Sequence, residues 1–342
     1  MSFSKGAFLL FTCLSLGGSA WAPAGQAQKQ GNPQVIQVQV DMVTLPVVVT
    51  NREGRRVTDL KQEDFQVFED KALQKIAGFA ATDEPISVAL ALDSSGSMEK
   101  RLARLQNEAI RFVTLLHPDD SVAIMSFADD VNLLEDFSID RKRNAYGIKE
   151  TRANGYTSLY EAVWLALEEV LRPVKERNAL VLFTDGVDTA SRKASAKDTI
   201  QLAKETHATI YSIYYNTERD MLRSQGSARG VGGVGFPVPP IIVGPGASGS
   251  GSSASEYMAG RLYLTQLAEY TGGSLFDALD MEDLGPAFEA IARELASQYS
   301  IGYYSTNTKR DGKFRNVEVR VNRPGLVVRT RKGYVVPKPP KD

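Results

Sequence analysis

Short apolar segments alternate with amphipathic helical patterns from about residue 85 to residue 297, and this alternation restricts the fold more than any other feature of the sequence. It predicts repeated units of strand, helix and strand, which build a mostly parallel sheet with helices on both faces. Two of the strand segments, ISVALAL and ALVLF, are apolar at almost every position, as strands covered on both faces should be. We therefore expect a doubly wound α/β domain over residues 85–297.

The segments on either side of this region show apolar and polar residues in alternation. Residues 34–82 and 298–337 both have the pattern of short strands separated by turns. Because one or two hairpins are unstable alone, we expect the two segments to pack together as one β-sandwich-like domain, with the α/β domain inserted between them. Within the α/β domain, residues 223–255 are rich in Gly, Ser and Pro without periodicity, which predicts a flexible surface insertion.

The amino terminus has the pattern of an export signal. Lys5 precedes an apolar run over residues 7–16, and small residues suit signal peptidase after Ala22 or Ala27. The alternative is a membrane anchor, but the run is shorter than the roughly 20 apolar residues that span a bilayer. We expect a signal peptide over residues 1–27 and a periplasmic, secreted or cell-surface protein.

The overall composition restricts the chemistry further. The 342 residues include 40 Lys and Arg against 41 Asp and Glu, a formal net charge of −1 at pH 7. Nucleic-acid-binding proteins carry strongly basic faces, so nucleic acid is not an expected partner. The only cysteine, Cys13, lies in the apolar run of the signal peptide, so the mature chain would have neither a disulfide nor a cysteine nucleophile.

Side chains with oxygen atoms gather where the predicted strands end. The first strand of the α/β domain ends at Asp93, and Ser95 and Ser97 follow on the turn that leads to the next helix. Asp185 ends a later strand in the same way, and Thr157 lies in a loop just before a helix. Ligands of open parallel sheets bind at the carboxyl ends of the strands, so we expect these groups to share one edge. Carboxylate and hydroxyl oxygens suit Mg²⁺, Mn²⁺ or Ca²⁺ rather than zinc.

Other polar residues have simpler interpretations. Asp129 and Asp130 follow another predicted strand, where a solvated turn explains them better than a contribution to the metal site. His117 and His207 each follow a helical segment, where a favourable charge at the helix end is sufficient explanation. The alternative to a metal site at Asp93 is that this side chain and a neighbouring serine merely cap the next helix.

The five oxygen-bearing residues resemble the motif of a known family. DSSGS at positions 93–97 resembles the DxSxS element of von Willebrand factor A domains, Thr157 in NGYTSLYEAV resembles their loop threonine, and Asp185 in TDG resembles their later aspartate. The resemblance covers roughly residues 85–297. The flanking β segments and the ending VNRPGLVVRTRKGYVV further resemble a bacterial subfamily of exported proteins related to these domains.

This resemblance implies a metal-ion-dependent adhesion site. In such a site Ser95 and Ser97 would ligate Mg²⁺ directly, and Mn²⁺ or Ca²⁺ could replace it. Asp93 and Asp185 would act directly or through water. Thr157 would join according to the conformational state. The resemblance also implies that rearrangement of the ligands can be coupled to movement of the final helix, at about residues 282–297.

The function that the resemblance implies is non-enzymatic protein binding or adhesion outside the cytoplasm. A protein partner would present an Asp or Glu that completes the coordination of the cation. One alternative is a Mg²⁺-dependent phosphoester hydrolase, because such enzymes also place Asp at strand ends. The motif at Asp93 lacks the second aspartate of a DxD phosphatase motif and a catalytic Lys or His. The other alternative is an envelope assembly protein in which the metal only stabilises the fold.

Overall fold

A computed structural model of the chain describes residues 42–81, 84–215, 254–336 and 338. The predicted signal peptide (1–27) and residues 223–253 of the predicted insertion lie outside the described residues. Residues Val40–Asp342 belong to one compact unit. Among the described residues, no helix has both the length and the apolar character needed to span a bilayer.

The central element is a six-stranded sheet in the order β10-β9-β8-β5-β6-β7. Neighbouring strands are parallel except for β6 and β7, which are antiparallel. The strands are β5 (Ser87–Asp93), β6 (Ser121–Phe127), β7 (Val131–Ser138), β8 (Asn178–Thr184), β9 (Thr209–Tyr215) and β10 (Leu275–Ala278). All residues of β8 and all but the first of β5 are buried, because helices cover both faces. The predicted mostly parallel α/β sheet is confirmed.

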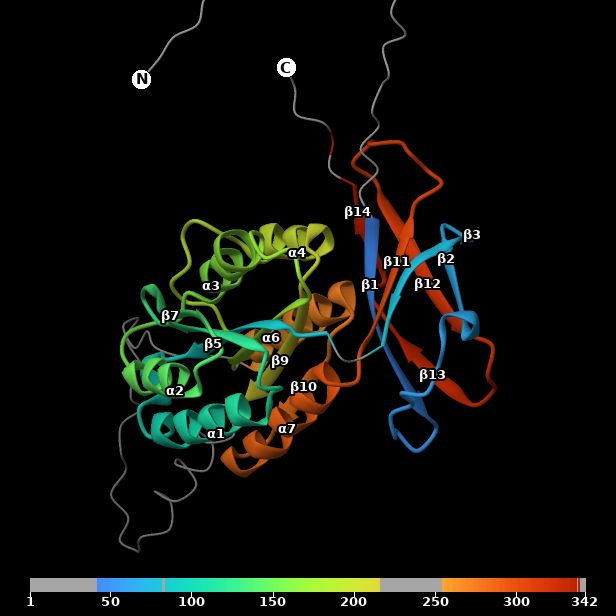
Figure 1. The fold of residues 1–342 in the computed structure, drawn as a ribbon. Helices are drawn as coiled ribbons and strands as arrows, with labels where there is room; N and C mark the ends of the chain where they lie inside the picture. Colours follow the sequence, from blue (N-terminus) through green and yellow to red (C-terminus); the bar gives the residue numbers. More distant parts are fainter. Residues whose placement is uncertain (1–41, 82–83, 216–253, 337, 339–342) are drawn as a thin grey trace, which may run out of the picture. The chain divides into compact units, whose positions relative to one another are not determined.

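Two groups of helices enclose this sheet (Figure 1). One core contains side chains of α1, α2 and α7, and the other contains side chains of α3, α4 and α6. The α-helices are α1 (Leu102–Leu115), α2 (Arg141–Glu150), α3 (Leu159–Leu165), α4 (Ala196–Glu205), α6 (Ala254–Thr271) and α7 (Leu284–Leu295). The short helical segments are η1 (Gln62–Asp64), η2 (Gly96–Met98), the π-helical η3 (Ala166–Leu171) and η4 (Met281–Asp283).

Strands from the two ends of the described chain form a β-sandwich. One sheet has the order β13-β1-β11-β4 and the other has the order β14-β12-β2-β3. The strands are β1 (Met42–Asn51), β2 (Phe65–Glu69), β3 (Ala72–Gln74), β4 (Ile76–Ala80), β11 (Tyr299–Tyr304), β12 (Phe314–Val321), β13 (Leu326–Arg329) and β14 (Gly333–Val335). Alternate residues of both sheets share one core, for example Leu45, Ile301 and Val67. The predicted β-sandwich is confirmed, while the exact domain bounds stay a prediction.

Some details differ from the sequence-based expectations. The apolar pattern does not reveal α2, because Asn144, Gly147 and Ile148 are its only buried residues and most others are charged or polar. Helix α6 begins at Ala254, so the last two residues of the predicted insertion (223–255) are helical instead of irregular. The last glycine of that segment is Gly251, and nothing after it opposes a helix.

Arginines of the β-sandwich domain bind the carboxyl ends of three α/β helices. Arg331, which is 3% exposed, donates to the carbonyls of Lys204 and Thr206 at the end of α4, at 3.0 and 2.9 Å. Arg329 donates to the carbonyl of Gly272 just after α6 at 2.8 Å. Both Arg329 and Arg56 form ion pairs with Glu294 near the end of α7. Helix carboxyl ends have unpaired carbonyls and partial negative charge, which explains why cations are placed there.

Candidate metal centre

Asp93 is the last residue of β5 and only 2% of its surface is exposed. Its Oδ1 accepts a hydrogen bond from the amide of Ser95 at 3.0 Å, and its Oδ2 accepts one from the hydroxyl of Thr184 at 2.9 Å. Burial raises the pKa of Asp93, and the hydrogen bonds from Ser95 and Thr184 oppose that rise. The carboxylate is thus held in one orientation by the turn after β5 and by the end of β8.

The hydroxyl oxygens of Ser95 and Ser97 lie 3.0 Å apart. Both residues belong to the turn that leads from β5 into the short helix η2. Gly96 between them allows a close approach to the neighbouring loop, because its amide donates to the carbonyl of Gly155 at 3.0 Å and a Cβ would lie 3.2 Å from the same oxygen. The two hydroxyl oxygens therefore lie side by side, on the turn whose Ser95 amide is hydrogen-bonded to Asp93.

The loop that carries Thr157 is fixed against this turn. The amide of Asn154 donates to the carbonyl of Ser94 at 2.9 Å, and the amide of Tyr156 donates to Oδ1 of Asp129 at 2.9 Å. Gly155 has a φ of +58°, and a Cβ at this position would lie 1.7 Å from Oδ2 of Asp129. Only glycine fits there without displacing the loop. The loop accordingly brings Thr157, which is 6% exposed, to the same end of the sheet.

Asp185 follows directly after the last residue of β8. Its Oδ1 accepts a hydrogen bond from the amide of Val187 at 3.1 Å. The amide of Thr157 donates to the hydroxyl of Thr189 at 2.9 Å, and the amide of Thr189 donates to the carbonyl of Thr157 at 2.9 Å. The loop after Asp185 is therefore joined to the loop that carries Thr157. All five sequence-predicted residues lie at the carboxyl end of the sheet, on β5, β8 or segments bonded to them.

The chemistry of these side chains fits a hard divalent cation. The five residues offer two carboxylates and three hydroxyls, and hard cations such as Mg²⁺, Mn²⁺ and Ca²⁺ prefer oxygen ligands. Among the described residues there is no group of three or more His, Cys, Asp or Glu side chains arranged to hold a metal. A cation at this edge would therefore depend on the serine and threonine hydroxyls as well as on the carboxylates.

The order and placement of these residues agree with a match at the level of protein families. Residues 88–187 match the family model described as von Willebrand factor type A domain. The chain contains a von Willebrand factor type A domain. The matched range includes β5 from its second residue, all of β6 and β8, and all five residues of the candidate metal centre. Domains of this family are generally adhesion or interaction modules rather than enzymes.

Solved structures also match the chain, at low sequence identity and with TM-scores below 0.5. The vWF domain of the type V pili tip protein Mfa5 from Porphyromonas gingivalis is 13% identical, with 61% of this chain and 94% of that chain covered and a TM-score of 0.44. A von Willebrand factor type A protein from Catenulispora acidiphila is 12% identical, with 80% and 72% covered and a TM-score of 0.45. Proximal thread matrix protein 1 from the mussel byssus, with a zinc-occupied MIDAS motif, is 16% identical, with 64% and 47% covered and a TM-score of 0.43. No curated protein matches the sequence.

Three residues of the von Willebrand factor type A domain that support the site were not predicted as site residues. Thr184 orients Asp93, Thr189 joins two loops, and Asp129 holds the loop next to Thr157. Asp129 is exposed, as the solvated turn predicted for it requires, but its carboxylate also has this structural role. Its position two residues after the end of β6 is the sequence signal that could have indicated it. Thr184 could have been found from the parallel register, because Leu92 pairs with Phe183.

The two histidines lie at the other end of the sheet. His117 precedes β6, and its side chain is 64% exposed and contacts Asp119 at 3.7 Å. His207 precedes β9. Both positions are at the amino ends of strands, so neither imidazole belongs to the edge that carries Asp93. Their placement after α1 and α4 agrees with the expectation of histidines at helix ends.

Proposed function

We propose that this chain is an exported, non-enzymatic module that binds a protein partner through a Mg²⁺ ion. The ion would be held by Asp93, Ser95, Ser97, Thr157 and Asp185. The observation that carries the proposal is the pair of hydroxyl oxygens 3.0 Å apart on Ser95 and Ser97, placed next to a buried carboxylate. Neutral hydroxyls paired in this way are good ligands for a hard cation and poor groups for acid–base catalysis.

The charge of the donor set supports a role in partner binding. The formal charge of two carboxylates balances that of one divalent cation, and the other three of the five ligands are neutral hydroxyls. Mg²⁺ prefers octahedral coordination, which five side chains do not complete. When bound, the cation would accept a carboxylate oxygen from outside the chain, so an Asp or Glu of a partner is the expected ligand.

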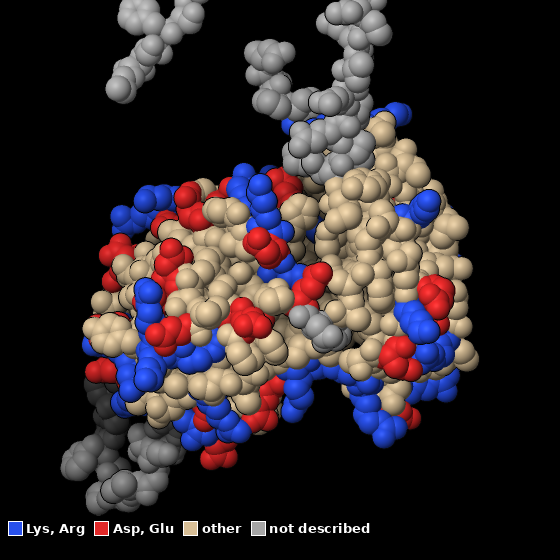
Figure 2. Space-filling view, viewed as in Figure 1, with Lys and Arg blue, Asp and Glu red and all other residues tan. Residues whose placement is uncertain are grey.

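The surface charge supports a protein partner of this kind rather than a polyanion. Basic and acidic side chains are interspersed on the face shown in Figure 2, in line with the formal net charge of −1. A nucleic-acid partner would call for a concentrated basic face. Export rests on the predicted signal peptide at residues 1–27, and it would place the site among envelope or extracellular proteins.

The direct test is calorimetric titration of MgCl₂ into the full chain. Asp93→Asn preserves the shape of the side chain but removes its charge, and it should lower Mg²⁺ affinity by at least about tenfold. Asp119→Asn makes the same chemical change at the amino end of the sheet, where the side chain is 70% exposed, and it should leave the affinity unchanged. Equal Mg²⁺ affinity of the wild type and Asp93→Asn would refute the site.

A second measurement separates binding from catalysis. In the first assay, the wild type and Asp93→Asn are each used to capture envelope proteins in Mg²⁺ and then in EDTA. In the second assay, each is incubated with a generic phosphoester in Mg²⁺. Capture that requires both Mg²⁺ and Asp93 supports the module. Phosphoester turnover that disappears in Asp93→Asn would instead identify a metal-dependent hydrolase.

A further inference from the structure

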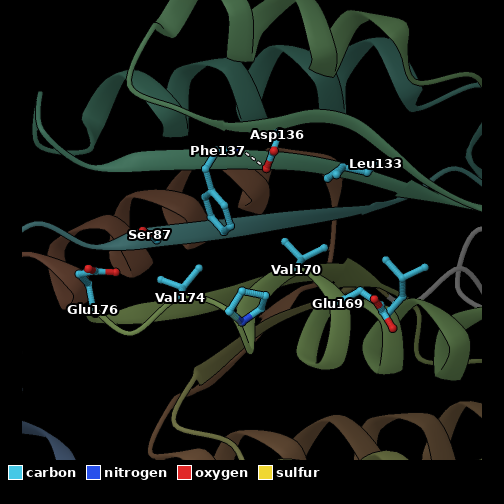
Figure 3. Close-up of a pocket in the computed structure, with 10 residues that line it drawn as sticks. Ser87, Leu133, Asp136, Phe137, Glu169, Val170, Val174 and Glu176 are labelled. Carbon is cyan, nitrogen blue, oxygen red and sulfur yellow. Dashed lines mark hydrogen bonds between the residues drawn. The ribbon is translucent and has the colours of Figure 1, made fainter.

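A second surface feature lies away from the candidate metal centre, between strand β7 and the segment η3 (Figure 3). It is a groove with a volume of about 590 Å³, which is within the range of pockets that hold ligands. Most of its lining is apolar. The apolar side chains come from β7, from the end of α3, from η3 and from the turn that follows it: Leu133, Phe137, Leu165, Val170, Pro173 and Val174.

The local backbone explains why the groove is open. Strand β7 is the edge strand of the sheet, and its pairing with β6 shifts register twice. Opposite it, η3 is wound as a π-helix, with the amide of Arg172 donating to the carbonyl of Leu167 at 3.1 Å. Pro173 then prevents the helix from continuing. The ring of Phe137 extends from β7 toward Val170 and Val174, and the three side chains line the groove together (Figure 3).

The charged residues of the groove all have the same sign. The described residues that line it include Asp136, Glu169 and Glu176, and they include no Lys or Arg. Within the described part of the chain, these three acids form no ion pair. The carboxylate of Asp136 accepts a hydrogen bond from the amide of Phe137, which donates to Oδ1 at 2.7 Å. An apolar groove with an uncompensated acidic rim favours a ligand that is apolar at its centre and basic at its edges.

The scarcity of neutral polar groups among the described lining residues decides the class of ligand. Pockets for small molecules contain a few converging hydrogen-bonding groups that fix the ligand's orientation. Among the described residues that line the groove, Ser87 is the only neutral polar one, and its hydroxyl already accepts a hydrogen bond from the hydroxyl of Ser121 at 2.9 Å. The groove suits apolar side chains presented by a polypeptide, for which the rim charges supply the specificity.

We propose that this groove binds a short segment of a partner protein in which Leu or Phe side chains are flanked by Lys or Arg. Ser87 begins β5 and Asp93 ends it, so these two residues are about 20 Å apart along the strand. Leu133 lies nearer to the carboxyl end of the sheet, but none of the residues that line the groove is one of the five candidate metal ligands. Binding in the groove is therefore independent of divalent cations, and the inference does not rest on the function proposed above.

The test uses a fluorescein-labelled peptide, Lys-Leu-Lys-Phe-Lys-Leu-Lys, and fluorescence anisotropy with the full chain in EDTA. Two control peptides replace every apolar residue by Ser or every Lys by Glu. The first peptide should bind at least about tenfold more tightly than either control, because it alone matches both the apolar lining and the acidic rim. MgCl₂ in place of EDTA should not change its affinity.

Variants then locate the bound peptide. Glu169→Lys combined with Glu176→Lys changes two exposed rim residues, and it should lower the affinity at least about tenfold without affecting the fold. Leu133→Ser, at a side chain that is 47% exposed, should also weaken binding. Glu63→Lys is the matched control, since this glutamate is exposed on η1 in the β-sandwich domain.

Three results would overturn the proposal. The first is that the basic apolar peptide does not bind. The second is that the wild type and the variant with both Glu169→Lys and Glu176→Lys bind it equally. The third is a wild-type dimer in sedimentation that Leu133→Ser dissociates, because a second copy of the chain would then occupy the groove.

Discussion

The two ends of the central sheet differ in chemistry although the same strands and helices form both. At the carboxyl end, β5 and β8 finish in Asp93 and Thr184, and loops place hydroxyls and carboxylates there. At the amino end, helices α4, α6 and α7 finish, and Arg331, Arg329 and Arg56 bind their last carbonyls or Glu294. The difference follows from chain direction in an α/β fold, which sends strand ends and helix ends to opposite edges. The carboxyl edge of the sheet is suited to bind a metal cation, while the amino edge already contains the positively charged side chains of three arginines.

The largest expected effect is at the arginine end. Arg331→Met removes hydrogen bonds to the carbonyls of Lys204, Thr206 and Gly333 and leaves helix-end carbonyls without partners. Burial lowers the pKa of Arg331 to about 10, so it is charged at neutral pH and its bonds are charge-assisted. We expect a loss of about 3 kcal/mol in the free energy of unfolding, measured by urea denaturation.

The matched control for this prediction is Arg55→Met. The side chain of Arg55 is 78% exposed and its ion pair with Glu53 spans 3.6 Å, so its loss should change stability by less than about 0.5 kcal/mol. If both variants unfolded at the same urea concentration, the contacts of Arg331 with the helix ends would not stabilise the fold.

The sequence predicted the carboxyl end of the sheet much better than the amino end. Asp93 and Asp185 could be placed because each follows an apolar strand, and the position of a strand end needs only local pattern. Ser95, Ser97 and Thr157 could be placed from the turn after the first strand and from a loop just before a helix, and the resemblance to a family motif agreed with that placement. Thr184 and Asp129 were missed as supports because their partners are 91 and 27 residues away in sequence, so only the fold brings them together.

The arginine contacts could not be predicted for a similar reason. Arg329 and Arg331 lie in a segment that reads as an ordinary strand with basic residues, LVVRTRKGYVV. Most of their partners are backbone carbonyls, which no side-chain pattern marks, and the side-chain partner of Arg329, Glu294, is 35 residues away in sequence. The groove beside β7 depends on a π-helical segment, and LALEEVL has the composition of a normal α-helix. Local sequence patterns therefore could not predict features that depend on packing between distant segments.

A smaller effect is expected from a single methyl group at the metal end. Gly155→Ala would place a Cβ 1.7 Å from Oδ2 of Asp129 and displace the loop that carries Thr157. We expect Mg²⁺ affinity to fall by about tenfold in calorimetric titration. Gly54→Ala is the control, because Gly54 also has a positive φ of +76° but a Cβ added there would have no other atom within 4 Å. Gly54→Ala therefore introduces an unfavourable backbone conformation without a steric clash, and it should leave the Mg²⁺ affinity unchanged. Unchanged Mg²⁺ affinity in Gly155→Ala as well would show that the loop does not help to bind the cation.

The smallest expected effect tests whether the two ends are independent. Glu294→Gln weakens the ion pairs with Arg329 and Arg56 but preserves a hydrogen-bonding side chain of similar size. We expect a loss of about 1 kcal/mol in stability, because the side chain is only 12% exposed and both partners are arginines. Mg²⁺ affinity should stay within about twofold of the wild type, since the arginines keep further bonds to backbone carbonyls and the end of α7 remains in place. A larger change in Mg²⁺ affinity would mean that α7 transmits the state of its carboxyl end to Asp93, as the coupling implied by the family resemblance requires, and the two ends would then form one mechanical unit.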